Sequence, residues 1–379
     1  MIPFNIPPFL PQCEAYMSQA AQSHKICGDG PFTKRCNDIL ESITGASKAL
    51  LTTSCTSALE LAALLLDIKA GDEVIMPAFT FVSTANPFVL RGASIIFTDI
   101  CPDTMNLDPV SVRKAVTVRT RAIVPVHYAG ICCNMKALWA IAKEYGLWMV
   151  EDAAQALTST YQGRPAGALS DLGCISFHET KNFSMGEGGA ILLNDPKWVE
   201  RAEIIREKGT NRSRFHRGQV DKYTWVDIGS SYLPSELNAA YLLAQLEQRD
   251  EIISARMARW CQYWEGLEDL TKLERIERMV IPADCTHNAH MFYIKTRNLE
   301  ERTRLIDYLK AREIVAVFHY IPLHSAEAGL KFSRFHGEDR YTTRESERLL
   351  RLPMYHQLAQ SECDRVIDAI HDFYNKVLF

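Results

Sequence analysis

The first half of the chain alternates short apolar runs with longer segments of helical periodicity. Most of the apolar runs are bounded by turn-forming or charged residues, as is typical of strands buried on both faces of a sheet. The runs that predict strands are Lys48–Thr52, Glu73–Met76, Ser94–Thr98, Arg121–Val126, Leu147–Glu151, Gly173–Phe177 and Ala190–Leu193. Helical segments between them include Ser57–Ile68, Met135–Tyr145 and Pro196–Glu207. This alternation predicts an α/β domain with a seven-stranded, mainly parallel sheet covered by helices.

The pattern changes after Ser235, where one long helical stretch continues to about Leu267. Shorter strands and helices follow it and predict a second α/β unit. The strands are Arg275–Ile281, Met291–Lys295 and Val315–Phe318, and the helices lie near Glu301–Arg312, Arg344–Arg351 and Ser361–Phe373. We therefore predict a large domain over residues 1–245, including an N-terminal arm, and a small C-terminal domain over residues 246–379.

Length and composition limit the class of protein. A chain of 379 residues exceeds what one hydrophobic core usually serves, which agrees with two domains. The net charge of −4 gives no basic footprint, so we expect no nucleic-acid partner. The N-terminus lacks the features of a signal peptide, and no run approaches the ~20 apolar residues of a membrane span. Eleven cysteines without a C-x-x-C pair fit reduced thiols, so we expect a cytoplasmic protein without a membrane partner.

One lysine lies in a polar loop between the last two predicted strands of the large domain. Lys181 belongs to the segment SFHETKNF, which is followed by Gly186, Gly188 and Gly189. Loops carried by a rigid sheet often hold reactive groups, and glycines let a ligand approach the backbone closely. Lys181 is either an ordinary surface charge or an amine nucleophile that forms a Schiff base with a carbonyl cofactor.

Polar residues that could serve such a lysine follow three other predicted strands. Asp152 falls beyond the fifth strand, where ligands of open α/β sheets bind. Its carboxylate could pair with the ring nitrogen of pyridoxal phosphate, or it could cap a helix. The turn Thr52–Ser57 could bind a phosphate at a helix N-terminus or only cap that helix, and Ser176 could add a further donor. Phe81 could stack on a flat cofactor or belong to the core.

Two further segments are candidates for ligand contacts. The basic loop Lys208–Gly218 carries arginines whose forks suit phosphate oxygens, although a solvated loop is an equal alternative. The segment from His319 to His324 resembles a ligand-lining loop. His287 and His290 lack further partners that would complete a metal site, so we expect none. The absence of G-x-S-x-G, and of G-x-G-x-x-G after the first strand, argues against a serine hydrolase and a Rossmann oxidoreductase.

Taken in order, four segments resemble the DegT/DnrJ/EryC1 family of nucleotide-sugar aminotransferases: Ser54–Leu59, Pro77–Thr84, Val150–Gln155 and Ser176–Gly189. The resemblance covers nearly the whole chain, including Leu352–Met354. It implies the aspartate-aminotransferase (type I) fold, with pyridoxal 5'-phosphate as the cofactor. It also implies a homodimer in which both chains build each active site.

The resemblance assigns roles by position. Lys181 matches the family's Schiff-base lysine, and Asp152 matches the partner of the pyridinium nitrogen. The remaining cofactor contacts that it implies in this chain are Thr56, Ser57, Phe81, Gln155 and Ser176. Related sugar dehydratases carry histidine in place of this lysine, so Lys181 favours amino transfer over dehydration.

One segment departs from the family pattern. The family commonly reads Gly-x-Asn-Tyr-Arg-Met before the long helix, and its asparagine reaches the cofactor phosphate of the partner subunit. This chain has Ser231 in place of the asparagine and Leu233 in place of the arginine. Ser231 can still donate a hydrogen bond over a shorter reach, whereas Leu233 has no interpretation.

Within the family, the segments FHETKN, REKGTNRSRFHRGQVDKYTW and VFHYIPLH resemble enzymes that aminate dTDP-4-keto-6-deoxy-D-glucose at C4. The resemblance implies L-glutamate as the amino donor and dTDP-4-amino-4,6-dideoxy-D-galactose and 2-oxoglutarate as products. The substrate contacts that it implies are His178, Arg212, Arg214, Arg217, His319, Tyr320 and His324. Amination at C3, an equatorial amine at C4, a pyridoxal-phosphate lyase and a non-enzymatic regulator stay open as alternatives.

Overall fold

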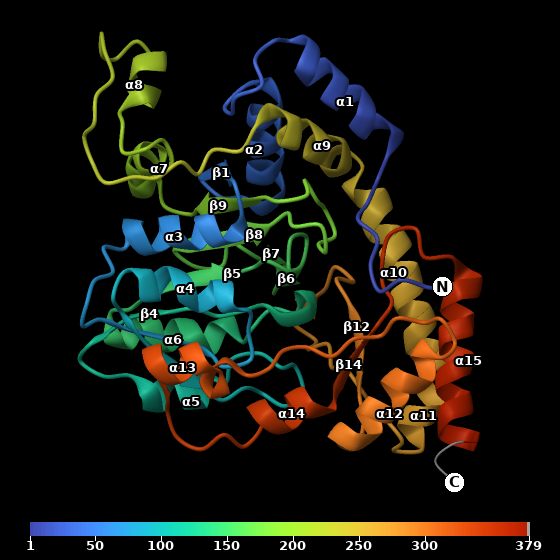
Figure 1. Ribbon diagram of the computed structural model, residues 1–379. Helices are drawn as coiled ribbons and strands as arrows, with labels where there is room; N and C mark the ends of the chain where they lie inside the picture. The colour runs from blue at the N-terminus through green and yellow to red at the C-terminus, as the bar shows by residue number, and fades with distance from the viewer. Residues whose placement is uncertain (377–379) are drawn as a thin grey trace.

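A twisted sheet fills the centre of the computed structural model, which describes residues 1–376 (Figure 1). Its strands lie in the order β1 (Lys48–Thr52), β9 (Gly189–Leu193), β8 (Leu172–Ser176), β5 (Trp148–Asp152), β4 (Thr120–Ile123), β2 (Glu73–Pro77), β3 (Ser94–Thr98) and β13 (Ser333–Phe335). Neighbouring strands are parallel except at β9, which runs antiparallel to both β1 and β8. The mainly parallel sheet predicted from the apolar runs is therefore present.

The predicted count of seven strands is one too low, because β13 joins the free edge of β3. This strand has only three residues, two of them polar, and its pairing partner lies more than two hundred positions earlier in the chain. A local apolar pattern cannot reveal such a strand. In addition, β4 ends at Ile123 instead of Val126, and Pro125 in the missing part has no N–H for a ladder hydrogen bond.

Helices cover both faces of this sheet. One face packs against α3 (Cys55–Leu65), α4 (Val82–Leu90) and α7 (Val199–Arg206). The other face packs against α2 (Pro31–Thr44), α5 (Pro109–Ala115) and α6 (Met135–Tyr145). Side chains of β9 alternate between the two cores, with Ala190 and Leu192 in one and Ile191 and Leu193 in the other. This alternation is why the strands read as continuous apolar runs in the sequence.

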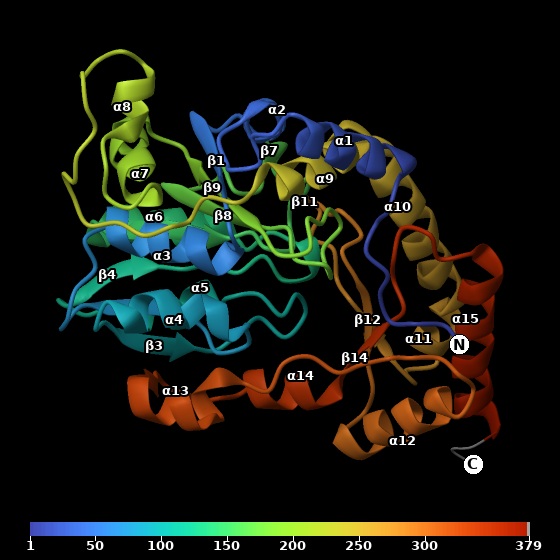
Figure 2. The same cartoon turned by 45° about the horizontal axis from the view of Figure 1, so that its top comes forward.

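The predicted helix from Ser235 to Leu267 is two helices, α9 (Glu236–Glu247) and α10 (Arg249–Gly266), with a break at Gln248. No glycine or proline marks this break, so the sequence pattern runs through it. Figure 2 shows α10 leading from the top of the large sheet toward the small one. The small sheet is antiparallel and consists of β10 (Glu277–Arg278), β12 (Phe292–Lys295) and β14 (Leu349–Leu352).

The remaining elements surround these two sheets. The helices are α1 (Pro11–Gln22), α8 (Arg212–His216), α11 (Glu268–Lys272), α12 (Leu299–Lys310), α13 (Glu327–Phe332), α14 (Thr342–Arg348) and α15 (Gln360–Lys376). A third sheet joins β6 (Thr160–Tyr161), β7 (Arg164–Pro165) and β11 (Cys285–Thr286). The predicted strand Val315–Phe318 is reduced to a single bridge between Val317 and Arg351. No helix within residues 1–376 has both the length and the apolar character to cross a membrane.

Several contacts cross the predicted domain boundary at residues 245 and 246. The later part of the chain supplies β13 to the large sheet. The N-terminal arm packs on the later part, where Ile2 bridges Ile314 and the Met354 amide donates to the Phe4 carbonyl at 3.2 Å. The boundary itself stays a prediction, and it lies close to the end of α9 at Glu247.

A fully buried carboxylate fixes the carboxyl end of β5. Glu151 accepts hydrogen bonds from the amides of Gly167 and Leu169, both at 2.7 Å, and from the Ser170 hydroxyl at 3.0 Å. The His127 Nε2 lies 2.9 Å from the same carboxylate. This network holds the segment after β7 and the segment after β4 against the strand end that carries Asp152.

We predict that Glu151→Gln destabilises the protein by about 1–3 kcal/mol, because one side-chain oxygen replaced by an NH₂ group leaves a buried amide donor unpaired. Chemical unfolding followed by tryptophan fluorescence measures the change. Glu144→Gln is the matched control, since the carboxylate of Glu144 forms an exposed pair with Arg113, and solvent-exposed pairs contribute little to stability. Equal stability of the two variants would contradict the role given to Glu151.

Candidate active site

A cavity of about 750 Å³ lies at the carboxyl ends of β5 and β8 and extends to β14 of the small sheet. Of the residues predicted for the site, those that line the cavity are Thr56, Phe81, Asp152, Gln155, Ser176, His178, Lys181, His319 and Tyr320. Those that do not line it are Ser57, Arg212, Arg214, Arg217, Ser231 and His324. The predicted lysine and aspartate are therefore in one cavity, although more than two dozen residues separate them in the sequence.

Lys181 lies on the loop that connects β8 to β9. The loop is closed by a backbone hydrogen bond that the Phe177 amide donates to the Gly188 carbonyl at 2.8 Å. The side-chain amide of Asn182 donates to the backbone carbonyl of Asn288 at 2.8 Å, which anchors the loop to the segment that precedes β12. Burial lowers the pKa of Lys181 below its usual value, and the nearby Asp152 carboxylate partly opposes this shift. The amine is therefore more easily deprotonated than a surface lysine, which makes it a better nucleophile and base.

Asp152 is held with its carboxylate toward the cavity. The Thr84 hydroxyl donates to its Oδ2 at 2.7 Å, and the Ala154 amide donates to its Oδ1 at 3.2 Å. No helix begins directly after β5 in the described chain, where β6 is the next element. The alternative that Asp152 caps a helix is therefore wrong. Its fixed carboxylate can face a cationic ring nitrogen of a ligand.

The N-terminus of α3 forms one corner of the cavity. The Ser54 hydroxyl caps the helix by accepting the Ser57 amide at 3.0 Å, and the Thr56 hydroxyl donates to Ser83 at 2.8 Å. The first amides of a helix have no acceptor within it, so this corner suits an anion such as phosphate. Gly189 allows β9 to pass beneath the corner, because a Cβ there would lie 2.4 Å from the Cys55 nitrogen.

Two further hydroxyls lie around this corner. Ser176 ends β8 directly opposite Gly189 in the strand register, and its hydroxyl accepts the His178 amide at 3.3 Å. Ser57 does not line the cavity, but its hydroxyl lies 3.0 Å from that of Ser54, which does. Ser57 thus acts on the corner through Ser54.

Aromatic side chains form the opposite wall. Phe81 is 55 % exposed although it is a large apolar side chain, and its ring lies 6.1 Å from that of Tyr320. Gln155 is fixed between the Ala129 amide, which donates to its Oε1 at 2.6 Å, and the Tyr320 hydroxyl at 3.3 Å. His319 contacts the Tyr128 hydroxyl at 3.0 Å, and burial lowers its pKa well below the usual value. An exposed ring beside fixed polar groups suits a flat aromatic ligand.

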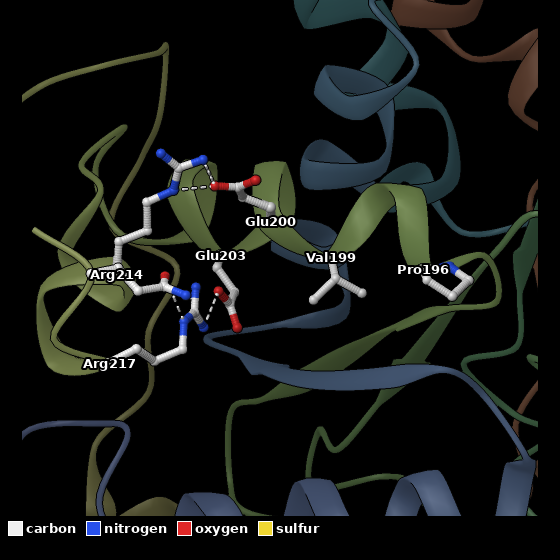
Figure 3. A pocket seen from close by; sticks show the side chains of 7 residues that line it. Pro196, Val199, Glu200, Glu203, Arg214 and Arg217 are labelled. Carbon is white, nitrogen blue, oxygen red and sulfur yellow. Dashed lines mark hydrogen bonds and ion pairs between the residues drawn. The ribbon is translucent and has the colours of Figure 1, made fainter.

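The arginines predicted for substrate binding lie on α8, which protrudes from the rest of the chain in both overall views (Figures 1 and 2). Figure 3 shows Arg214 and Arg217 pointing to carboxylates of α7. Arg214 pairs with Glu200, Arg217 pairs with Glu203 at 2.8 Å, and Arg212 lies 3.4 Å from Glu207. Within one chain these side chains do not reach the cavity, so their substrate role stays a prediction.

Two other predicted residues also lie outside the cavity. His324 pairs with Asp339 at 3.1 Å and contacts the ring of Phe335, which holds it beside β13. Ser231 is exposed and bridges to Glu207. Their assigned roles stay predictions.

Several residues in or beside the cavity had no signal in the sequence. Thr84, which binds Asp152, reads as an ordinary polar position of a short helix. Phe4 belongs to a proline-rich arm, and Arg351 belongs to an apolar run near the end of the chain. Folding alone brings these residues to the lysine. In the sequence, His290 is notable only as a histidine without metal partners. In the structure, its Nδ1 lies 3.0 Å from the side-chain oxygen of Asn182.

Residues 11–371 match the model of the DegT/DnrJ/EryC1/StrS aminotransferase family. The spore coat polysaccharide biosynthesis protein SpsC of Bacillus subtilis (strain 168) is 31% identical over 358 residues, which are 90% of each protein. The aminotransferase TlmJ from Streptoalloteichus hindustanus has a TM-score of 0.91 with 26% identity over the full length of both chains.

Two further similar structures were solved with the cofactor or with an intermediate bound. DesV from S. venezuelae, in complex with a ketimine intermediate, has a TM-score of 0.87 and 30% identity over 98% of this chain and 99% of its own. Spr1654 from Streptococcus pneumoniae, in its PLP-form, has a TM-score of 0.89 and 26% identity over the full length of both chains. Sequence and structure thus agree over almost the whole protein, and the chain belongs to the DegT/DnrJ/EryC1/StrS aminotransferase family.

Proposed function

We propose that this aminotransferase uses pyridoxal 5'-phosphate to move an amino group from L-glutamate to C4 of dTDP-4-keto-6-deoxy-D-glucose. The products are dTDP-4-amino-4,6-dideoxy-D-galactose and 2-oxoglutarate. The observation that carries the amino-transfer chemistry is the meeting of Lys181, with its lowered pKa, and the fixed carboxylate of Asp152 in one cavity. The choice of sugar rests on the closer resemblance of FHETKN and VFHYIPLH to the dTDP-4-amino-4,6-dideoxygalactose transaminase of enterobacterial common antigen synthesis.

The cavity fits pyridoxal phosphate in each of its parts. The hydroxyl-rich start of α3 and Ser176 suit the phosphate, the exposed ring of Phe81 suits one face of the pyridine, and Asp152 suits the ring nitrogen. Lys181 is the amine for the aldehyde. The PLP-form of Spr1654 and the ketimine complex of DesV support the same cofactor in this chain.

When bound, the cofactor withdraws electrons from the bond that must break at the donor's α-carbon. The protein's own residues provide the proton transfers. Lys181 would accept the donor's α-proton and deliver it to the cofactor, because its lowered pKa leaves the amine free to act as a base. Asp152, held by Thr84 and Ala154, keeps a negative charge facing the ring nitrogen. In the second half of the reaction Lys181 delivers a proton to one face of the sugar at C4, which sets the configuration of the new amine.

We also infer a homodimer in which the segment around α8 contacts the partner. Ser231 and the arginines of α8 lie away from this chain's cavity, so their predicted roles can be met only at the site of a second chain. The segment between α8 and α9 exposes Tyr223, Trp225 and Val226, with Trp225 at 79 %. Exposed apolar side chains of this kind support an interface.

We predict that Lys181→Ala still binds pyridoxamine phosphate but has no detectable turnover, because the substitution removes the amine that would bind the cofactor aldehyde and move the proton. Binding is measured by absorbance after gel filtration, and turnover by the release of 2-oxoglutarate. Lys272→Ala, which removes a surface lysine that pairs with Glu268 and lies outside the cavity, serves as the control and retains activity. Appreciable turnover by Lys181→Ala would exclude the mechanism.

The lowered pKa of Lys181 predicts the pH dependence of cofactor loading. An amine attacks an aldehyde only when unprotonated, so a lower pKa moves the rise in rate to lower pH. Covalent loading of cofactor-free protein, followed by visible absorbance, should therefore reach half its maximal rate below the pH found for a free lysine derivative such as Nα-acetyl-lysine. A midpoint at or above that of the free amine would contradict this account.

We predict that incubation with pyridoxal phosphate, L-glutamate and dTDP-4-keto-6-deoxy-D-glucose gives an axial amine at C4, together with one equivalent of 2-oxoglutarate. Product NMR determines both the position and the configuration. An amine at C3, or an equatorial amine at C4, would overturn the sugar assignment and leave the amino-transfer chemistry intact. Glutamate that fails to convert the cofactor would instead point to a lyase.

A further inference from the structure

Arg351 places a guanidinium in the wall of the cavity without a carboxylate partner among the described residues. It comes from β14, where its backbone pairs with Val317. Its Nη2 donates to the Phe318 carbonyl at 3.1 Å, and the ring of Phe4 lies 4.6 Å from the guanidinium. Its Nε is buried and has no hydrogen-bond partner. The side chain is thus held in place while part of its donor capacity is unused.

A second buried arginine shows what a structural arginine looks like in this protein. Arg256 donates to three backbone carbonyls, those of Ala289, His290 and Met354, at 3.0, 2.7 and 3.4 Å. It does not line the cavity. Arg351 donates to one carbonyl, from Phe318, and faces the cavity. The difference indicates that Arg351 is kept for a ligand.

The surroundings of Arg351 do not balance its charge. Lys181, a second cationic group, lines the same cavity, and burial lowers the pKa values of His290 and His319, which leaves these rings neutral. Tyr128 and Tyr320 also face Arg351, and burial raises the pKa of each phenol. Unlike Arg256, Arg351 keeps a buried donor without a partner within residues 1–376, and such a donor on a cationic group is costly. This side of the cavity therefore favours an anionic ligand.

Three anionic groups enter the proposed reaction. The cofactor phosphate already has its place at the start of α3, which lies well apart from β14 in both overall views (Figures 1 and 2). The diphosphate of the nucleotide sugar is separated from the reacting carbonyl by the sugar ring. The α-carboxylate of the donor is bonded to the carbon that carries the reacting amine, so its binding group must lie near Lys181. Arg351 is close enough to influence the charge of Lys181 directly.

We propose that Arg351 binds the α-carboxylate of the amino donor and thereby selects an amino acid over a simple amine. A guanidinium fork matches the two oxygens of a carboxylate, and such charge-assisted hydrogen bonds are among the strongest in proteins. The bound carboxylate fixes the α-carbon beside Lys181, where its proton can be removed. This inference rests on the proposed function.

The test compares Arg351→Met and Arg351→Lys with wild type in the two half-reactions of the holoenzyme. Conversion of the cofactor by L-glutamate is followed by the loss of visible absorbance. The return reaction is followed from the pyridoxamine form with dTDP-4-keto-6-deoxy-D-glucose. Calorimetry measures the binding of glutarate and of dTDP, and 4-aminobutyrate, which lacks an α-carboxylate, serves as the comparison donor. Arg340→Met is the matched control, since that arginine pairs with Glu338 on the surface.

We expect Arg351→Met to lower the second-order rate with glutamate about 100-fold, with an intermediate loss for Arg351→Lys, and to weaken glutarate binding. The rate with 4-aminobutyrate should stay within about twofold of wild type, and so should the rate of the return reaction and the affinity for dTDP. The variant should therefore lose most of the wild-type preference for glutamate over 4-aminobutyrate. Circular dichroism and cofactor absorbance establish whether each variant is folded. If Arg351→Met does not fold, the comparison of Arg351→Lys with wild type decides the role of Arg351.

Other outcomes overturn the inference in distinguishable ways. Weaker dTDP binding with an unchanged glutamate reaction would make Arg351 a diphosphate ligand. Equal losses in both half-reactions, or no loss in either, would make it structural. If wild type itself does not react with glutamate, the proposed function fails instead. If wild type reacts with glutamate but not with the ketosugar, only the sugar assignment fails and the donor measurements still decide the role of Arg351.

Discussion

The site depends on two adjacent carboxylates that a single strand points in opposite directions. Successive side chains of a strand face opposite sides of the sheet, so Glu151 and Asp152 at the end of β5 cannot serve the same purpose. Glu151 faces the core and is saturated by donors from Gly167, Leu169 and Ser170. Asp152 faces the cavity and receives the hydroxyl of Thr84. A shift of β5 by one residue would exchange the two positions. Asp152 would then be buried in the core, and Glu151 would leave the network that holds the end of the sheet together.

The two sheets make different contributions to the cavity. The large sheet and its loops supply Lys181, Asp152, Ser176 and the start of α3, which are the groups suited to the cofactor. The small sheet supplies Arg351, which we propose to bind the amino donor, and the N-terminal arm supplies Phe4, whose ring lies 4.6 Å from that guanidinium. Cofactor binding and choice of substrate can therefore change separately, because the residues concerned belong to different elements.

The sequence predicts the first group far better than the second. The seven apolar runs of the large sheet are local patterns, and all seven are strands, with β4 shorter than predicted. Lys181 and Asp152 stand out because polar residues follow buried strands. Arg351 does not stand out, because it interrupts an apolar run that forms β14, a strand whose partner β12 lies more than fifty residues earlier in the chain. The substrate role predicted for the arginines at α8 stays a prediction, because within one chain Arg214 and Arg217 pair with Glu200 and Glu203 of the preceding helix and do not reach the cavity.

The position of β13 in the large sheet bears on how the protein is made. On the ribosome, β3 emerges more than two hundred residues before Ser333–Phe335, the segment that covers its outer edge. At roughly 5–20 residues per second, that edge stays open for tens of seconds during translation. An open edge strand of apolar residues such as Ile95, Ile96 and Phe97 is a template for pairing with another chain. The nascent chain is therefore most exposed to aggregation before its last quarter is synthesised, a period when a chaperone that shields sheet edges would raise the yield of active enzyme.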